Sequence, residues 1–449
     1  MTNYKKFFEG KKITVVGLGL LGKRLGDITF LAECGAKVLV TDLKTAKELA
    51  PSIKKLKKYK NIKYVLGRHR FEDFSARGGS AFGGEGPDFI LKGQGVALDS
   101  PYIQHARKNG IPIEMDESLF AKLAPGVKII GVTGTRGKST TTILIYEILK
   151  NAGLRVYLGG NIKGTAALPL LKEEKDGDMV VFELSSWQLQ GFGDAGISPH
   201  ISVFTNFMPD HMNYYRNNLK TYFGDKSFIY KFQTKKDFLI LGGGMRKLVK
   251  NVKSKIINAR IKNILKNWQV NLKGKHNLEN IACAVEVARI LKVKEKVIQK
   301  TVENFKAIPG RLELVRNIRG VDIYNDTNST TPEATIAALN SFSQKVILIM
   351  GGMDKKLDTK KLNALLSKKT KQVILIPGSG ARKITNKKIN LHKTANLKTA
   401  IQKALREATA GDIILFSPAF TSFNLFKNEY DRGEQFMKIV KNLPKDEQA

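Results

Sequence analysis

The sequence predicts an α/β protein of three domains in series. Short β-rich apolar runs, each followed by a glycine-containing turn and then by helical patterning, recur in three regions of the chain. The length of 449 residues also exceeds one ordinary core. We expect a Rossmann-like domain at 1–124, a central P-loop ATPase-like domain with a parallel sheet at 125–305, and a Rossmann-like domain at 306–449.

The N-terminal region opens with the strand-like run ITVV. Gly17, Gly19 and Gly22 follow in G-x-G-x-x-G spacing, before a helix and a second strand, 37–42, that ends at Asp42. This order is typical of a nucleotide or diphosphate bound at a helix N-terminus. A tight turn that only packs the helix on the strand is the alternative.

The central region predicts a second phosphate site. A strand at 127–132 leads into a glycine loop and a helix at 139–153. Lys138 offers a cation for the β- and γ-phosphates, and the Ser139 hydroxyl can ligate Mg²⁺. Val132 stands where the common motif has glycine, yet the context indicates nucleoside triphosphate binding.

Acidic residues follow the next two predicted strands. Glu183 comes directly after the apolar run MVVF, and Asp210 and His211 follow the strand beginning at Ile201. Because parallel strands place their carboxyl ends at one edge, we expect these side chains near the phosphate loop. Glu183 is interpreted as a Mg²⁺ ligand rather than a solvated charge.

The C-terminal region supplies three further strand and turn pairs, at 346–352, 373–380 and 413–419. Pro309 and Gly310 precede it, as in a hinge.

Composition excludes several classes of protein. The 76 Lys and Arg residues exceed the 40 acidic ones and give a net charge of +36, but they are scattered without interleaved aromatics. We therefore expect attraction of anionic small substrates and no specific nucleic-acid binding. Cys34 and Cys283 fit buried hydrophobes. No apolar run reaches a membrane span and the start lacks a signal-peptide core, which favours a cytoplasmic protein without membrane insertion.

Nine ordered motifs resemble the Mur ligases, the ATP-dependent amide-forming enzymes of peptidoglycan synthesis. They are TGTRGKSTTT, GGNIKG, FELSSWQL, TNFMPDHM, KGKHNLENIACA, PGRLE, NDTNSTTPEATIAAL, GGMDKK and SPAFTSFNLFKNEYDRG. The family's loop ordinarily has no glycine at the position of Val132, so the irregular spacing is a family trait.

Within the family, the first glycine motif and the last motif are similar to those of the MurD-type members. The resemblance implies an ADP-forming ligase that adds glutamate to UDP-N-acetylmuramoyl-L-alanine through an acyl phosphate, in cell wall biogenesis that underlies cell shape and division. It implies ATP, two Mg²⁺ ions and a monomer. D-glutamate is the family default; L-glutamate, another amino acid, or another ligase of the Mur and folylpolyglutamate synthase superfamily stays open. A non-catalytic nucleotide-binding or nucleic-acid-binding protein is a further alternative, against which the intact Lys138, Glu183, His211 and Lys226 argue.

The resemblance also implies the site residues. The UDP substrate is expected on Gly17, Gly19, Leu20, Leu21, Gly22, Asp42, Asn161, Ser185 and Gln188. ATP is expected on Gly134, Thr135, Arg136, Gly137, Lys138, Ser139, Thr140, Asn277, Asn280, Arg311 and Asp326. Glutamate is expected on Thr330, Lys355 and Ser422. Catalysis is expected from Lys138, Glu183, His211 and Lys226, and the metals on Ser139, Glu183, His211 and Lys226 as a carbamate.

The sequence departs from the family at five places. Asn328 stands for a lysine, Glu429 for an aromatic residue, Gly310 for a histidine and Arg136 for an asparagine. The stretch 91–96, LKGQGV, replaces a S-P-G turn at the edge of the expected UDP site.

Overall fold

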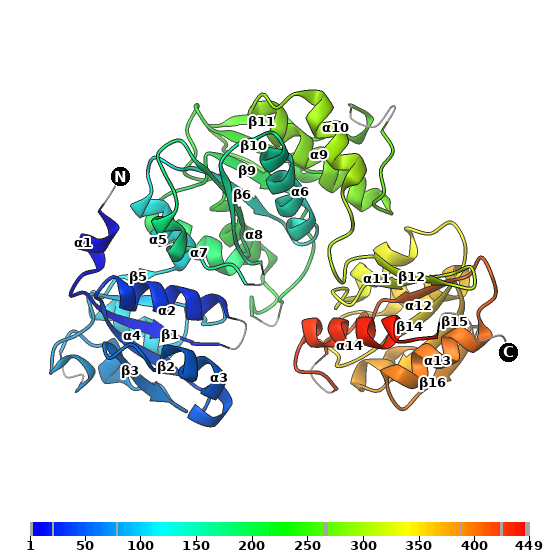
Figure 1. Cartoon of the computed structure of the whole chain (residues 1–449), viewed down its shortest axis with the longest axis horizontal. Coiled ribbons are helices and arrows are strands. Elements are labelled where there is room, and N and C mark those ends of the chain that lie inside the picture. The colour runs from blue at the N-terminus through cyan, green and yellow to red at the C-terminus, as the bar shows by residue number, and fades with distance from the viewer. Residues whose placement is uncertain are drawn as a thin grey trace. The chain divides into compact units, whose positions relative to one another are not determined.

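The computed structural model describes residues 3–19, 22–77, 80–162, 164–212, 214–263, 268–385, 388–422 and 425–444. Three sheets follow one another along the chain (Figure 1). Contacts divide the chain into two compact units, Met1–Lys266 with Glu279–Val302, and Asn267–Leu278 with Glu303–Ala449. The first two sheets belong to the first unit, and the expected domain boundaries stay predictions.

The N-terminal sheet has five parallel strands in the order β3-β2-β1-β4-β5. Its strands are β1 (Lys12–Val16), β2 (Lys37–Asp42), β3 (Ile62–Leu66), β4 (Phe89–Lys92) and β5 (Ile113–Glu114). Its helices are α1 (Tyr4–Phe8), α2 (Lys23–Glu33), α3 (Ala46–Leu56), α4 (Pro101–Lys108) and α5 (Asp116–Leu123). The strand order reverses between β1 and β4, and open α/β sheets bind ligands at such a reversal.

The central sheet has six parallel strands in the order β11-β10-β9-β6-β8-β7. Its strands are β6 (Lys128–Thr133), β7 (Val156–Gly160), β8 (Met179–Glu183), β9 (Ile201–Phe204), β10 (Phe238–Leu241) and β11 (Lys255–Asn258). Its helices are α6 (Lys138–Asn151), α7 (Ser186–Ala195), α8 (Leu219–Ser227), α9 (Lys275–Ile290) and α10 (Glu295–Asn304). The carboxyl ends of β6, β8 and β9 therefore meet at one edge.

The C-terminal sheet has the order β12-β13-β17-β14-β15-β16, and only its β12–β13 pair is antiparallel. Its strands are β12 (Glu313–Ile318), β13 (Val321–Asn325), β14 (Val346–Gly351), β15 (Thr370–Ile376), β16 (Asn390–Lys393) and β17 (Ile413–Phe416). Its helices are α11 (Pro332–Leu339), α12 (Lys360–Lys369), α13 (Leu397–Glu407) and α14 (Glu429–Lys441).

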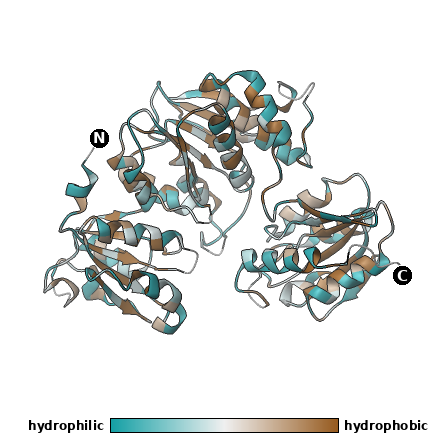
Figure 2. Ribbon diagram, in the orientation of Figure 1, coloured by the Kyte–Doolittle hydropathy of each residue, from teal (hydrophilic) through white to brown (hydrophobic). Residues whose placement is uncertain are grey.

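Strand alternation explains why helices cover both faces of this sheet. Leu348 of β14 packs in a core with Leu362 of α12, whereas the next residue, Ile349, packs with Phe436 of α14. Successive side chains of a strand point to opposite faces, so a strand that is apolar throughout needs cover on both. Figure 2 shows hydrophobic residues concentrated along the strands and hydrophilic ones on the helices.

The predicted α/β fold class is confirmed. The expected strand at 37–42 is β2, the strand at 127–132 overlaps β6, and the expected helix at 139–153 is α6. Both cysteines are buried, as expected. Among the described residues, no helix has the length and apolar run needed to cross a membrane.

Candidate active site

The glycine loop between β6 and α6 has the backbone geometry of a phosphate-binding turn. Gly137 caps α6 in the left-handed region at φ 82°. A Cβ at Gly137 would lie 2.1 Å from the Asn280 side-chain oxygen, and one at Gly134 would lie 2.0 Å from the Thr205 hydroxyl. Only glycine fits these two positions, which leaves the helix N-terminus open to an anion.

Two lysines meet at this loop. Lys138 Nζ donates to the carbonyl oxygens of Gly134 and Thr135, both at 3.1 Å. Lys226 Nζ, from α8, donates to the same Gly134 oxygen at 2.9 Å. Burial, and then the charge of Lys138, lower the pKa of Lys226 well below its ordinary value. Lys226 therefore reaches the unprotonated form far more easily than a surface lysine.

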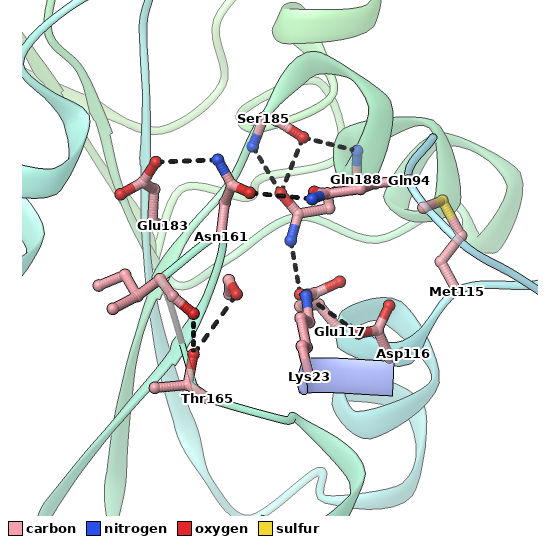
Figure 3. A network of polar contacts seen from close by, with 12 residues as sticks. Lys23, Gln94, Met115, Asp116, Glu117, Asn161, Thr165, Glu183, Ser185 and Gln188 are labelled. Atoms are coloured by element: carbon pink, nitrogen blue, oxygen red, sulfur yellow. Dashed lines mark hydrogen bonds and ion pairs between the residues drawn. The ribbon is translucent and has the colours of Figure 1, made fainter. Parts of the chain in front are cut away.

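Glu183 ends β8 with its carboxylate in the interior. Its residue is 2% exposed, and Oε1 accepts a hydrogen bond from Asn161 Nδ2 at 3.2 Å (Figure 3). Within the described part of the chain, Oε2 is buried and has no hydrogen-bond partner. An unsatisfied buried carboxylate oxygen is costly, and a bound cation would satisfy it.

The described residues hold no group of three His, Cys, Asp or Glu side chains arranged to bind a metal ion. Mg²⁺ usually takes one or two carboxylates and completes its shell with water and phosphate oxygens. The donor set at Glu183 therefore fits a nucleotide-bound Mg²⁺ better than a metal ion whose ligands all come from the protein.

Asp210 and His211 follow β9 beside the loop. Arg136 Nη1 donates to Asp210 Oδ2 at 3.0 Å, and His211 Nε2 lies 3.6 Å from the same oxygen. The His211 ring packs against Trp187, with 4.7 Å between ring centroids. Arg136, where the family has asparagine, thus neutralises an acidic residue next to the phosphate loop.

Ser185 and Gln188 form the capping box at the start of α7. The Ser185 hydroxyl donates to Gln188 Oε1 at 2.8 Å, and Gln188 Nε2 donates to Glu117 at 2.6 Å (Figure 3). Because their polar groups are engaged within the chain, these two residues orient α7 against α5. Their expected contacts with the UDP substrate stay predictions.

Glu117 belongs to a buried cluster of charges that joins α2 to α5. Lys23 forms ion pairs with Asp116 and Glu117, and Arg24 lies 3.7 Å from both Asp27 and Asp116. Burial and the charge of Asp116 raise the pKa of Asp27 to about 8 and that of Glu117 to about 7. Two cations thus face three buried carboxylates, and burial favours the protonated forms of Asp27 and Glu117.

The side chain of Asp42 holds the N-terminal glycine loop by hydrogen bonds to its backbone. Asp42 Oδ2 accepts hydrogen bonds from the backbone N–H groups of Leu18 and Gly19 at 2.8 and 3.2 Å, and Oδ1 accepts from Lys44. Gly17, Gly19 and Gly22 all have positive φ. The expected contacts at Leu20 and Leu21 lie outside the described residues.

Several expected ATP residues lie in the second unit. Asp326 accepts from the Ser417 hydroxyl at 2.8 Å and from the Leu312 N–H at 3.1 Å, and burial raises its pKa to about 6. The charge of Arg311 acts on this carboxylate, so the structure brings these two together. Asn277 donates to the Lys273 carbonyl at 2.8 Å.

The expected glutamate residues are distributed around β13, β14 and β17 of the second unit. Ser422 is 2% exposed, and its hydroxyl has no partner among the described groups. Lys355 is exposed after β14, and Thr330 is half-buried after β13. Asn328 Nδ2 donates to the Pro309 carbonyl at 3.3 Å.

Sequence reasoning missed Arg432, the arginine of the last motif. It is fully buried and donates to Thr327 Oγ1 at 3.0 Å, to the Thr327 carbonyl at 2.6 Å and to the Phe420 carbonyl at 3.1 Å. Burial lowers its pKa to about 10. Arg432 thereby fastens the loop after β13 to the loop after β17; its place in a recognised motif was the available signal.

This chain is similar to known protein families and to individual known proteins. The family described as Mur ligase middle domain matches residues 132–264, and the Mur ligase glutamate ligase domain matches 310–420. The UDP-N-acetylmuramoylalanine--D-glutamate ligase of Acetivibrio thermocellus is 33% identical over 99% of both chains. That of Koribacter versatilis is 34% identical over 98% of this chain and 99% of its own.

Solved structures are similar in fold. The UDP-N-acetylmuramate-alanine ligase MurC of Thermotoga maritima superimposes with a TM-score of 0.59 and 16% identity, covering 96% of this chain and 99% of its own. MurF of Acinetobacter baumannii gives a TM-score of 0.59 and 14% identity, covering 98% of this chain and 93% of its own.

Proposed function

Because the chain belongs to the Mur ligase family, we propose that it joins D-glutamate to UDP-N-acetylmuramoyl-L-alanine with cleavage of ATP to ADP and phosphate. The bond formed is the amide between the alanine carboxyl group and the glutamate amine. The relatives at 33% and 34% identity are D-glutamate ligases, which favours D-glutamate over the L-isomer.

The observation that carries this proposal is the meeting of Lys138 and Lys226 on the Gly134 carbonyl. A phosphate loop with one mobile lysine is common to many nucleotide-binding proteins. The second lysine, Lys226, is buried, its pKa is lowered, and the charge of Glu183 acts on it. Nucleotide binding by the loop does not by itself require such a residue. This arrangement supports ligation rather than nucleotide binding alone.

The first chemical step transfers the γ-phosphoryl group to the alanine carboxylate. The carboxylate oxygen attacks phosphorus and the bond to the β-phosphate oxygen breaks. ADP departs, and the alanine carboxyl group becomes an acyl phosphate. Lys138 and the N–H groups at the start of α6 would stabilise the negative charge that develops on the transferred group. In the second step the glutamate amine attacks the acyl carbon, loses a proton, and phosphate departs.

Lys226 is proposed to act as a carbamate. Its neutral amine attacks carbon dioxide, a C–N bond forms, and one proton is released. The product is an anion where an ammonium ion would repel Lys138 and any metal. The lowered pKa of Lys226 supports this modification because only the neutral amine is nucleophilic.

Glu183, His211, Ser139 and carbamylated Lys226 are the residues proposed to hold two Mg²⁺ ions. When bound, Mg²⁺ supplies positive charge against the phosphate oxygens of the nucleotide. The buried, unpartnered Oε2 of Glu183 supports a ligand role within the described part of the chain. His211 is kept near its place by Asp210 and Trp187.

The domain roles follow from the same proposal. Residues 1–124 would bind the UDP moiety on the glycine loop, 125–305 ATP, and 306–449 the amino acid. The five-stranded N-terminal sheet argues against a folylpolyglutamate synthase, since those enzymes lack this glycine domain.

A panel of amino acids tests the proposed function. The purified chain, ATP, Mg²⁺ and UDP-N-acetylmuramoyl-L-alanine are incubated with D-glutamate, L-glutamate, L-alanine or L-lysine, and phosphate release and amide product are measured. D-glutamate should give the fastest turnover, with none in the absence of the UDP substrate. Turnover of another amino acid in preference to D-glutamate would refute the assignment.

A further inference from the structure

Three polar side chains at the ends of three strands form a continuous chain of hydrogen bonds (Figure 3). Gln94 follows β4, Asn161 follows β7 and Glu183 ends β8. Gln94 Nε2 donates to Asn161 Oδ1 at 3.0 Å, and Asn161 Nδ2 donates to Glu183 Oε1 at 3.2 Å. These hydrogen bonds link the N-terminal sheet to a carboxylate of the central sheet.

Each amide in this chain has a defined orientation. If the Asn161 amide turned over, its oxygen would face the Glu183 carboxylate and its NH₂ group would face the Gln94 NH₂ group. Both contacts would be repulsive. The Glu183 carboxylate can only accept, so it requires the Asn161 NH₂ group, and the donor of Gln94 reinforces that orientation by holding Asn161 Oδ1. Glu183 Oε2 has no hydrogen-bond partner among the described residues.

The loop that carries Gln94 is itself held firmly. Lys92 is fully buried, and its Nζ donates to the Val96 carbonyl at 2.7 Å. Arg24 donates to the Lys92 carbonyl at 3.2 Å, and the Gly93 N–H donates to the Val16 carbonyl at 3.2 Å. These bonds fix the loop beside the end of β1, where the first glycine motif begins.

The Asn161–Glu183 end of this series of hydrogen bonds is equally constrained. The Asn161 N–H donates to the Glu183 carbonyl at 2.8 Å. Gly160 has φ 88°, and a Cβ there would lie 2.1 Å from the same carbonyl oxygen. The ends of β7 and β8 are thus in close contact, and Asn161 has little freedom to move away from Glu183.

We propose that Gln94 is a positioning residue that orients the metal-binding carboxylate of Glu183 through Asn161. The proposal rests on the proposed function for the identity of the metal, Mg²⁺. Gln94 lies in the stretch 91–96, LKGQGV, which stands in place of the S-P-G turn expected from the family resemblance. Through it the loop beside the UDP site influences how firmly the metal is held.

The variants Gln94→Ala and Gln94→Met test the proposal. Gln94→Met keeps the length of the side chain without its donor. Titration of Mn²⁺, followed by the EPR signal of the free ion in the presence of AMP-PNP, measures metal affinity without turnover. Both variants should bind Mn²⁺ about 3- to 10-fold more weakly and need correspondingly more Mg²⁺ for half-maximal activity.

The control is Gln104→Ala, on α4 of the same sheet, where an exposed glutamine donates to the Leu98 carbonyl. It should leave Mn²⁺ affinity unchanged. Gln94 variants that match this control, or that raise only the KM for the UDP substrate, would overturn the proposal.

A double variant checks that Gln94 acts through Asn161. If it does, Gln94→Met with Asn161→Ala should bind Mn²⁺ no more weakly than Asn161→Ala alone. Fully additive losses would contradict the chain of hydrogen bonds. If the wild-type chain forms no amide from D-glutamate but Gln94→Met still weakens Mn²⁺ binding, the proposed function fails and the positioning role stands.

Discussion

Lys138 and Lys226 donate hydrogen bonds to one oxygen atom, the carbonyl of Gly134, at 3.1 and 2.9 Å. Two ammonium ions that donate to one oxygen atom lie close together, and in a buried site they would repel each other. Burial, and then the charge of Lys138, lower the pKa of Lys226, the more deeply buried of the two, so Lys226 loses its charge more readily.

Replacing Lys226 by alanine should lower the rate of amide formation by about 100-fold or more, because a proposed ligand of Mg²⁺ beside the reacting phosphate is lost. ATP binding should largely survive, since Lys138 and the loop are unchanged. Steady-state rates and nucleotide titration measure the two effects, and added short carboxylates should restore part of the rate.

Lys231→Ala is the matched control, because Lys231 lies over the rings of Phe228 and Phe232 rather than at the loop. With ¹³C-labelled bicarbonate, the wild-type chain should show a carbamate carbon resonance that Lys226→Ala lacks. Unchanged activity in Lys226→Ala would remove the carbamate assignment.

Replacing Arg136 by asparagine, the residue usual in the family, should raise the KM for ATP about 3- to 10-fold. Asp210 would lose a cation 3.0 Å away and present its charge to the incoming phosphates. The double variant Arg136→Asn with Asp210→Asn should recover most of the affinity. If the double variant is weaker than Arg136→Asn alone, the two residues do not act as a charge-balancing pair.

Asp27→Asn should make the stability of the first unit less dependent on pH. The pKa of Asp27 is raised to about 8 in the folded chain, so the folded state holds a proton that the unfolded state loses above about pH 4. Stability contributed by this proton is therefore lost as pH rises towards 8, at up to about 1.4 kcal/mol per pH unit.

Melting temperatures at pH 6 and pH 8 measure this effect. The advantage of Asp27→Asn over the wild type should be larger at pH 8, and the asparagine oxygen can still accept from the Leu168 N–H, as Asp27 does at 3.2 Å. Asp99→Asn, in an exposed pair with Arg216, should show no such trend. Equal differences at both pH values would argue against a protonated Asp27.

Arg432→Ala should destabilise the second unit by about 3 kcal/mol, because a buried guanidinium and its contacts to two loops are lost. Amide hydrogen exchange resolves the unit separately, and protection should fall in the loops after β13 and β17. Lys438→Ala, at an exposed position of α14, is the control. Equal protection in the two variants would show that Arg432 does not fasten these loops.

The elements that the sequence predicts best are those whose signal is local. Uninterrupted apolar runs ending in glycine predict β1, β6 and β14, since strands buried on both faces have this pattern. The predicted roles of Lys138 and Glu183 also rest on a local signal, because Lys138 begins the helix after such a strand and Glu183 ends another.

What the sequence does not predict depends on partners that are distant along the chain. Gln94 contacts Asn161 across 67 positions, and Arg432 contacts Thr327 across 105. Asp42 shows another limit: its spacing after the glycine motif predicts a ligand contact, which stays a prediction, but does not indicate that its oxygens accept from Leu18, Gly19 and Lys44. Which hydrogen bonds form depends on tertiary packing, which no local pattern records.

The contact between Trp187 and His211, with ring centroids 4.7 Å apart, gives the chain an intrinsic optical probe. The sequence contains two tryptophans, so Trp268→Phe leaves Trp187 as the sole indole. Indole fluorescence is quenched by a neighbouring imidazolium and changes when that ring is drawn to a metal. Stopped-flow emission from Trp187 would therefore follow the loading of the site in real time, without a label.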